Sequence, residues 1–103
     1  MNTKFQAILT KEEMERIKDK VAEDGTEKIT VDLHKLTTKQ AKRLINNVIT
    51  MSRDTCEVRL IHGFNHGTAI KTMISRDIHN PRIKRRFQAP NNPGLTTLCL
   101  ASA

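Results

Sequence analysis

One segment of the chain decides the fold: KITVDLHKLTTKQAKRLINNVITMSRDTCEVRLIH, residues 28–62. It opens with a β-branched run over 28–33 and closes with an apolar run over 57–62, both typical of strands. Between these runs, apolar residues recur from Ala41 at i, i+3, i+4, i+7 and i+8, which predicts a helix over 38–49. Strand, helix and strand form a βαβ unit, so we expect parallel strands joined by a right-handed crossover.

We expect the rest of the chain to add to this unit on both sides. Thr10 and Glu13 fit a capping box, and the apolar spacing after them predicts a helix over 10–23 that the turn residues 24–26 end. C-terminal to the unit, the pattern predicts a helix over 68–79, a strand over 82–88, a turn over 89–94 and a strand over 95–100. The predicted fold class is therefore α/β, a two-layer sandwich of order β-α-β-α-β-β. It has a four-stranded mixed sheet with helices packed on it, plus an N-terminal helix.

Positive charge is concentrated in the second half of the chain. The formal net charge is +7, yet residues 1–57 hold eleven basic and ten acidic side chains, whereas residues 58–103 hold seven and one. A basic half favours a polyanionic partner, of which nucleic acid is the commonest, although a merely soluble basic protein is the alternative. With neither Trp nor Tyr and three Phe, the composition argues against a base-stacking platform like that of RNA-recognition motifs.

The run Arg82-Ile83-Lys84-Arg85-Arg86 places four cations within five residues. Such a strand is suited to phosphate contacts; the alternative is an edge strand that its charge protects from self-pairing. Period-two alternation predicts that Ile83, Arg85 and Phe87 share one face of the strand and that Lys84 and Arg86 share the other.

Polar side chains end both strands of the βαβ unit. Asp32 and His34 follow the first strand, and His62 and Gly63 follow the second. Neighbouring parallel strands share one edge of an open sheet at their carboxyl ends, where ligands bind. Asp32 and His34 are two apart and point the same way, and a carboxylate orients an imidazole for proton transfer at neutral pH. The alternatives are that Asp32 caps the following turn and that His34 or His62 is a hydrogen-bonded supporting residue.

The turn after the second strand leads into a helix N-terminus, whose free N–H groups suit an anion such as phosphate. Its glycines permit positive φ and a close approach of a ligand to the backbone. A divalent metal such as Mg²⁺ is compatible with the His and Asp side chains, but no spacing requires one, so we predict no certain cofactor and no metal ligand. The glycines and polar residues of this turn are Gly63, Asn65, His66, Gly67 and Thr68.

We expect the protein to act in the cytoplasm. Its two cysteines are too few for a disulfide framework, and reduced thiols are the default there. No apolar run is long enough to span a bilayer, and residues 1–13 lack the apolar region of a signal peptide, so we expect no membrane partner. We expect a monomer, with a dimer through the N-terminal helix as the alternative.

Five segments, taken together and in order, resemble the Small MutS-Related (Smr) domain family, in its short stand-alone bacterial type. They are Val31-Asp32-Leu33-His34, the helix over 38–49, Ile61-His62-Gly63 with Gly67-Thr68, the run over 81–85 and the run over 92–98. The resemblance covers about residues 28–101. It divides the chain into an N-terminal helix and linker over 1–27 and an Smr-like domain over 28–103.

The resemblance implies a domain similar to the C-terminal domain of translation initiation factor three. It also implies nucleic-acid binding, with endonuclease activity in many members, as DNA nicking or RNA cleavage. The family's D-x-H motif falls on Asp32 and His34, and its H-G-x-G motif begins at His62. Two positions depart from the family: its second glycine is Asn65 here, with Gly67 two positions later, and the glycine that often follows D-L-H is Lys35.

We therefore expect an endonuclease in which His34, oriented by Asp32, acts as general base or acid, and His62 stabilises phosphate charge or protonates the leaving oxygen. The alternatives are a nucleic-acid-binding module without catalysis and an adaptor that binds a protein through the N-terminal helix. The sequence leaves open DNA or RNA, the metal requirement and presentation by a ribosome. The predicted nucleic-acid contacts are Lys35, Gly63, Asn65, His66, Gly67, Thr68, Arg82, Lys84, Arg85 and Arg86.

Overall fold

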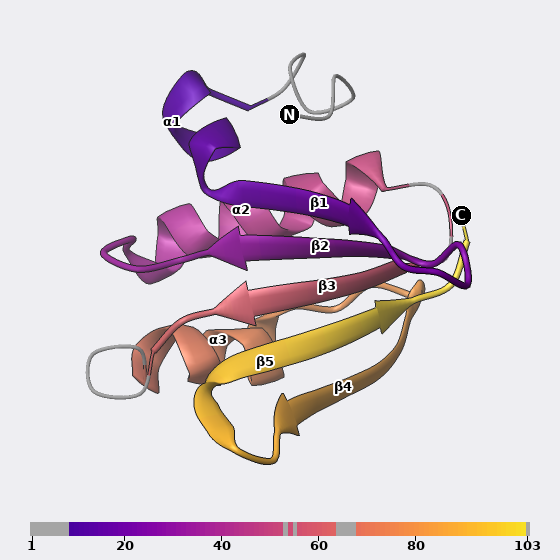
Figure 1. Ribbon diagram of the computed structural model, residues 1–103. Helices are drawn as coiled ribbons and strands as arrows, with labels where there is room; N and C mark the ends of the chain where they lie inside the picture. The colour runs from indigo at the N-terminus through magenta and orange to yellow at the C-terminus, as the bar shows by residue number, and fades with distance from the viewer. Residues whose placement is uncertain (1–8, 53, 55, 64–67, 103) are drawn as a thin grey trace.

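The computed structural model describes residues 9–52, 54, 56–63 and 68–102. Within these residues the chain forms one mixed sheet of five strands in the order β1-β2-β3-β5-β4 (Figure 1). The elements are α1 (Lys11–Glu15), β1 (Ile17–Val21), β2 (Glu27–Asp32), α2 (Thr38–Met51), β3 (Cys56–Ile61), α3 (Thr68–Asp77), β4 (Ile83–Ala89) and β5 (Asn92–Leu100). None of the described helices has the length and hydropathy needed to cross a membrane.

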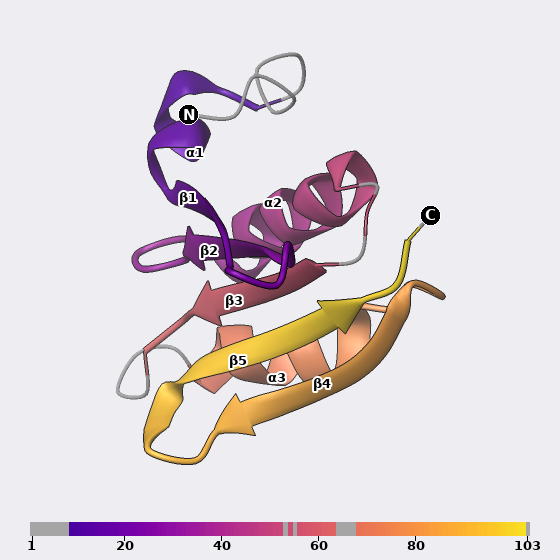
Figure 2. The same ribbon diagram turned by 45° about the vertical axis from the view of Figure 1, so that its right-hand side comes forward.

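The βαβ unit forms as predicted. β2 and β3 are parallel neighbours with Val31 opposite Leu60, and α2 begins with a capping box between Thr37 and Gln40. The predicted apolar stripe of α2 is buried, and Figures 1 and 2 show α2 and α3 together on one face of the sheet. The two-layer α/β sandwich is therefore confirmed, with its core between the helices and that face.

The helix predicted over 10–23 is wrong beyond residue 15. Its capping box forms, but α1 ends at Glu15, and β1 then pairs antiparallel with β2. The predicted stripe offered only three apolar side chains, and β1 buries Ile17 while leaving Val21 71% exposed. Pairing satisfies the backbone groups along the edge of β2, which a flanking helix would leave open. The expected four-stranded sheet is therefore corrected to five strands, and Gly25, at φ +87°, lies in the β1–β2 hairpin turn.

The last two strands also differ in detail from the prediction. A register irregularity between Ile83 and Arg85 breaks the expected alternation. Ile83 therefore lies opposite Leu100 and packs against the core, whereas Arg85 and Phe87 lie on the other face. A bulge of this kind adds one residue to a strand and reverses the side-chain pattern. The turn predicted over 89–94 is shorter, because β5 already begins at Asn92.

Candidate active site

Asp32 and His34 form a hydrogen-bonded pair at the carboxyl end of β2. Between them Leu33 is fully buried, so alternation turns both neighbours outward. Asp32 Oδ1 lies 2.7 Å from His34 Nδ1 and accepts the His34 main-chain N–H at 2.9 Å. Asp32 therefore caps the turn and orients the imidazole, which joins two interpretations that the sequence left as alternatives. Because a carboxylate only accepts, Nδ1 carries the proton and Nε2 is the basic nitrogen.

The pair is exposed to solvent, and Arg16 forms hydrogen bonds to the main chain of both of its residues. The side chains of His34 and Asp32 are 54% and 49% exposed. Arg16 Nη1 donates to the carbonyl oxygens of His34, at 2.7 Å, and Asp32, at 3.2 Å. The Asp32 N–H in turn donates to the Arg16 carbonyl oxygen at 2.9 Å. Arg16, the C-cap residue of α1, thereby holds the main chain on both sides of Leu33.

Lys35 follows the pair in a left-handed conformation, with φ +67°. Residues other than glycine rarely adopt this backbone conformation, because it brings Cβ close to the neighbouring carbonyl oxygen. This is the position at which the resemblance to the Smr family predicts glycine, and its φ is positive in this chain. Lys35 accepts that strain while adding an exposed cation next to the pair.

His62, at the end of β3, is buried, with 2% of its surface exposed. Its Nδ1 lies 2.7 Å from the Gly63 carbonyl oxygen and its Nε2 lies 2.8 Å from the Thr96 hydroxyl. A carbonyl oxygen can only accept, so Nδ1 carries the proton and Nε2 accepts from Thr96. Burial lowers the pKa of His62, and the charges of Lys71 and of protonated His34 lower it further, although the bond to Gly63 raises it. The imidazole is therefore neutral and internally bonded.

The two strand ends meet at Gly63. A Cβ on Gly63 would lie 3.3 Å from His34 Nε2, so the absence of a side chain lets the imidazole rest against the backbone. Gly94 of β5 approaches from the other side, where its Cβ would lie 3.0 Å from Gly63 Cα. Its carbonyl oxygen accepts the N–H groups of His62 and Gly63. The predicted convergence of Asp32, His34 and His62 is thus present, and it depends on β5.

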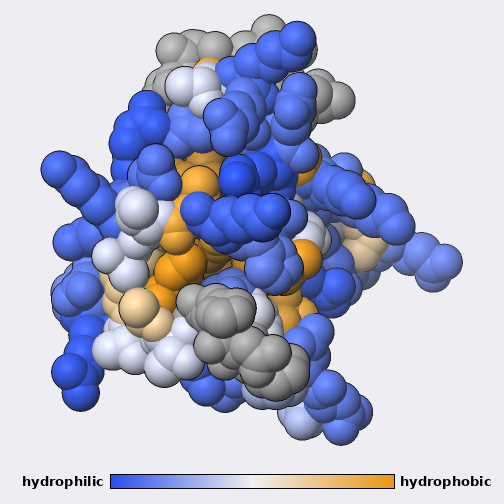
Figure 3. Space-filling view, turned by 90° about the vertical axis from the view of Figure 1, so that its left-hand side faces the viewer, coloured by the Kyte–Doolittle hydropathy of each residue, from blue (hydrophilic) through white to orange (hydrophobic). Residues whose placement is uncertain are grey.

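A cavity of about 330 Å³ opens beside the pair. Figure 3 looks onto this end of the molecule, where polar side chains surround a short apolar band. Two carboxylates and two cations line the cavity together with Asp32 and His34, so its charge is mixed. The lining residues are Glu12, Glu15, Arg16, Asp32, His34 and Lys35.

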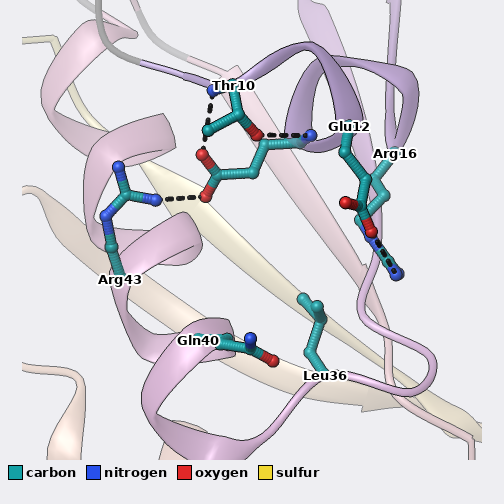
Figure 4. Close-up of a pocket in the computed structure, with 7 residues that line it drawn as sticks. Thr10, Glu12, Arg16, Leu36, Gln40 and Arg43 are labelled. Atoms are coloured by element: carbon teal, nitrogen blue, oxygen red, sulfur yellow. Dashed lines mark hydrogen bonds and ion pairs between the residues drawn. The ribbon is translucent and has the colours of Figure 1, made fainter.

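A second cavity, of about 210 Å³, lies between α1 and the start of α2 (Figure 4). The Glu13 carboxylate accepts from the Thr10 main-chain N–H and from Arg43. Burial raises the pKa of Glu13, but the Thr10 hydrogen bond, the Arg43 hydrogen bond and the Arg43 charge together outweigh it, so the pKa lies below its ordinary value. This contact attaches α1 to α2 and so sets the position of Arg16, which lines both cavities.

Neither protein-family models nor curated protein sequences match the chain. Among solved structures, the chain is similar to the Smr domain of MutS2 from Thermus thermophilus, with a TM-score of 0.55 and 26% identity. The match covers 69% of this chain and 95% of that domain. The chain contains an Smr-like domain. The resemblance seen in the sequence is therefore supported by the arrangement of the whole sheet.

The basic strand of this Smr-like domain divides its cations between two roles. Arg82 donates to the carbonyl oxygens of Ile49, Asp54 and Ala101. Arg86 donates to those of Ile74 and Ile78 in and after α3. Both guanidinium groups therefore bind main-chain carbonyl groups, and Arg82 lies beside the first residue of β4, at the end of the sheet away from Asp32.

The other two cations of the strand, Lys84 and Arg85, are exposed. The Arg85 guanidinium carbon lies 5.3 Å from the centroid of the Phe87 ring. Thr68 is exposed at the start of α3, whereas Asn65, His66 and Gly67 lie outside the described residues. Within the described part of the chain, no three His, Cys, Asp or Glu side chains are grouped as metal ligands would be.

Sequence reasoning missed three residues that complete the site of the Smr-like domain: Arg16, Gly94 and Thr96. Gly94 and Thr96 lie in the 92–98 run that contributes to the family resemblance, so that run could have indicated them. Arg16 lies outside the resemblance, in a segment predicted to be helical, and no pattern in the sequence pointed to its contact with Asp32 and His34.

Proposed function

We propose that this Smr-like domain binds nucleic acid and cuts its phosphodiester backbone, with Asp32 and His34 as the catalytic pair. The observation that carries the proposal is the 2.7 Å contact between an exposed imidazole and an exposed carboxylate beside a cavity. A proton-transfer group must reach its substrate, and the exposure of both side chains meets that requirement. The similarity to an Smr domain supports the same conclusion.

His34 Nε2 is the general base in this mechanism. It takes the proton from a ribose 2′-OH, in RNA, or from an attacking water, in either polymer, as the new oxygen–phosphorus bond forms. The bond to the leaving oxygen breaks, and the imidazolium of His34 gives the proton back to that oxygen, directly or through a water molecule. Asp32 holds the tautomer with the proton on Nδ1 and stabilises the imidazolium that forms. Both bonds of Asp32 Oδ1 to His34 serve this orientation.

His62 takes a positioning role in this proposal. Because its two ring nitrogens are paired with Gly63 and Thr96, it holds the backbone against which His34 rests. Lys35 is the cation nearest in sequence to the pair and would contact the phosphate. Gly63, Asn65, His66, Gly67 and Thr68 stay predicted contacts, as do Lys84 and Arg85; Arg82 and Arg86 are proposed to support the fold around them.

The deciding experiment uses labelled RNA and DNA of the same sequence, each with and without EDTA. The double variant Asp32→Asn/His34→Ala should cut at least about 100-fold more slowly than the wild type, since general acid–base groups contribute on that order. The matched control is Asp77→Asn/His79→Ala, which makes the same chemical changes at exposed positions at the other end of α3. Cutting by the first variant at the rate of the control would show the assignment to be wrong. The EDTA arm tests the requirement for a metal such as Mg²⁺.

The second candidate is a nucleic-acid-binding module without catalysis. It is favoured by the two carboxylates, Glu12 and Glu15, that share the cavity with the pair, because negative charge there opposes a phosphate. Binding that weakens steeply with salt, equal in wild type and double variant and without any product, would support it. Cytoplasmic location, a monomeric state and a ribosome as the source of substrate stay predictions.

A further inference from the structure

The face of the sheet opposite α2 and α3, here called the open face, carries two rows of side chains that cross all five strands. Alternation places them there, because their neighbours Ile29, Val58 and Leu98 point into the core. Cross-strand pairing defines each row from β1 to β4. The first is Lys18, Thr30, Arg59, Thr97 and Phe87, and the second is Lys20, Lys28, Glu57, Cys99 and Arg85.

The two rows contain five cations and one carboxylate. Glu57 lies 3.9 Å from Arg59 Nε and 4.0 Å from Lys28 Nζ, so it neutralises one charge of the group. Lys20 lies directly opposite Lys28, an arrangement of like charges that destabilises a sheet. An open face that concentrates positive charge against this penalty is complementary to a polyanion.

The first row ends on β4 with an exposed aromatic ring, and this ring indicates whether the polyanion is single-stranded or double-stranded. Phe87 is 39% exposed on the open face, and the Arg85 guanidinium lies over its ring. An exposed ring on a sheet stacks with a base only if that base is unpaired, since the bases of a duplex are already stacked on one another. The charges and the ring together therefore suit a single strand rather than a duplex.

The open face also leads to the candidate active site. Asp32 is the next residue of β2 on this face after Thr30, and two residues along a strand span about 7 Å. It lies opposite Ile61, which lies opposite Leu95, so the row beyond Lys18 and Arg59 contains Asp32 at its β2 position, and His34 follows just after the end of β2. A nucleic-acid strand that runs over the open face toward this row would bring a phosphate close to Asp32.

We propose that the open face binds a single-stranded segment of nucleic acid flanking the bond that is cut, so that unpaired strands are the substrate class. The inference rests on the proposed function for the cut itself, but the binding of single strands can be measured without any cutting. Binding is mainly to phosphates, through Lys18, Lys28 and Arg59, with one base stacked at Phe87. This interpretation agrees with the low aromatic content of the chain.

The first test measures the affinity of labelled single-stranded and duplex oligonucleotides by fluorescence anisotropy over a salt series. Lys18→Gln/Lys28→Gln/Arg59→Gln should bind single strands about tenfold or more weakly, and its log–log salt slope should fall by about two, as expected for three lost phosphate contacts. The control, Lys39→Gln/Lys42→Gln/Arg76→Gln, removes the same charges from exposed positions on the helices. Single-strand affinities that are equal for the two triple variants would overturn the proposal.

The second test uses Phe87→Trp, which introduces a single tryptophan into a chain that has none. Single strands should quench its fluorescence by stacking, and duplexes should quench it much less. Val21→Trp is the control, because Val21 is 71% exposed on β1 but lies in register with the helix-covered face. Equal quenching at both positions, or equal quenching by duplex at residue 87, would contradict single-strand binding on the open face.

The two proposals fail in different ways. If the Lys18/Lys28/Arg59 variant binds and cuts like its control while Asp32→Asn/His34→Ala does not cut, the open face is wrong and the catalytic pair stands. If the open-face variant loses single-strand binding and no protein cuts either polymer, the open face stands and the endonuclease proposal is wrong.

Discussion

His34 and His62 end two neighbouring parallel strands, yet the structure gives them opposite environments. The His34 side chain is 54% exposed and bonded to a carboxylate, whereas His62 is 2% exposed and bonded to a carbonyl and a hydroxyl. Burial favours the neutral ring of His62, whereas the carboxylate beside His34 holds the tautomer that leaves its Nε2 without a proton. Two histidines with similar sequence contexts therefore divide into one that suits proton transfer and one that supports the backbone beneath it.

The contrast also explains the glycines around the site. The side chain of His34 rests on Gly63, and Gly63 rests on Gly94, so the exposed imidazole is supported by backbone rather than by side chains. His62 holds this backbone from inside through its bond to the Gly63 carbonyl. We infer that the position of His34 depends on the buried His62. Four measurements test the contrast between these histidines and their surroundings, in order of decreasing expected effect.

The largest effect should come from His62→Ala. It leaves a cavity in place of a buried ring and two polar groups without their partner, which should lower the free energy of unfolding by about 2–4 kcal/mol. His34→Ala, at an exposed position, should change it by less than about 0.5 kcal/mol. Urea unfolding followed by circular dichroism measures both, since the chain has no Trp. Equal stability of the two variants would remove the distinction between the histidines.

Gly94→Ala should have the next largest effect. Its Cβ would lie 3.0 Å from Gly63 Cα and 3.2 Å from Gly63 C, and backbone atoms cannot move aside as a flexible side chain does. We expect a loss of about 1–3 kcal/mol in unfolding free energy, together with slower cutting as Gly63 shifts under His34. In the control Gly25→Ala, strain at φ +87° destabilises the hairpin but should leave cutting unchanged. Cutting lowered equally by both changes would mean that instability alone is responsible.

Lys35→Gly, next to His34, should raise the stability of the protein while weakening its binding of nucleic acid. Glycine relieves the left-handed strain at φ +67°, so the free energy of unfolding should rise by about 1 kcal/mol. Loss of the cation should at the same time weaken nucleic-acid binding, most clearly at low salt. Lys39→Gly removes a similar charge from the first turn of α2 and should instead lower stability by about 1 kcal/mol. Thermal unfolding and anisotropy at two salt concentrations provide both readouts.

The smallest effect should be the contribution of His62 to the pH dependence of stability. Burial lowers its pKa in the folded state, so the unfolded chain binds the proton more readily. The stability due to neutral His62 is then complete above the unfolded pKa of about 6.5 and is lost as the pH falls through the folded value. The free energy of unfolding should decrease as the pH falls below about 6.5, and His62→Gln should flatten this decrease. A decrease of unchanged size in that variant would assign it to other groups.

Local patterns predicted the parts of the fold that neighbouring residues decide. The capping box predicted at Thr10 formed, as did the buried stripe of α2 and the parallel pair β2 and β3. The helix predicted over 10–23 stopped at Glu15 because propensity and a thin stripe are weak against a strand edge that needs hydrogen-bond partners. The prediction that Ile83 shares a face of β4 with Arg85 and Phe87 was also wrong, because a pattern of alternation cannot reveal a bulge.

By itself the sequence determined the βαβ unit and the contact between Asp32 and His34, because helix periodicity and a two-residue spacing along one strand are local properties. Tertiary structure alone decided that His34 is exposed while His62 is buried against Thr96, that Gly94 supports Gly63 and that Arg16 holds the end of β2. These contacts join residues 16 to 34 positions apart. They depend on strand order and on which edge accepts β1, and such pairings follow from the packing of the whole sheet rather than from any single segment.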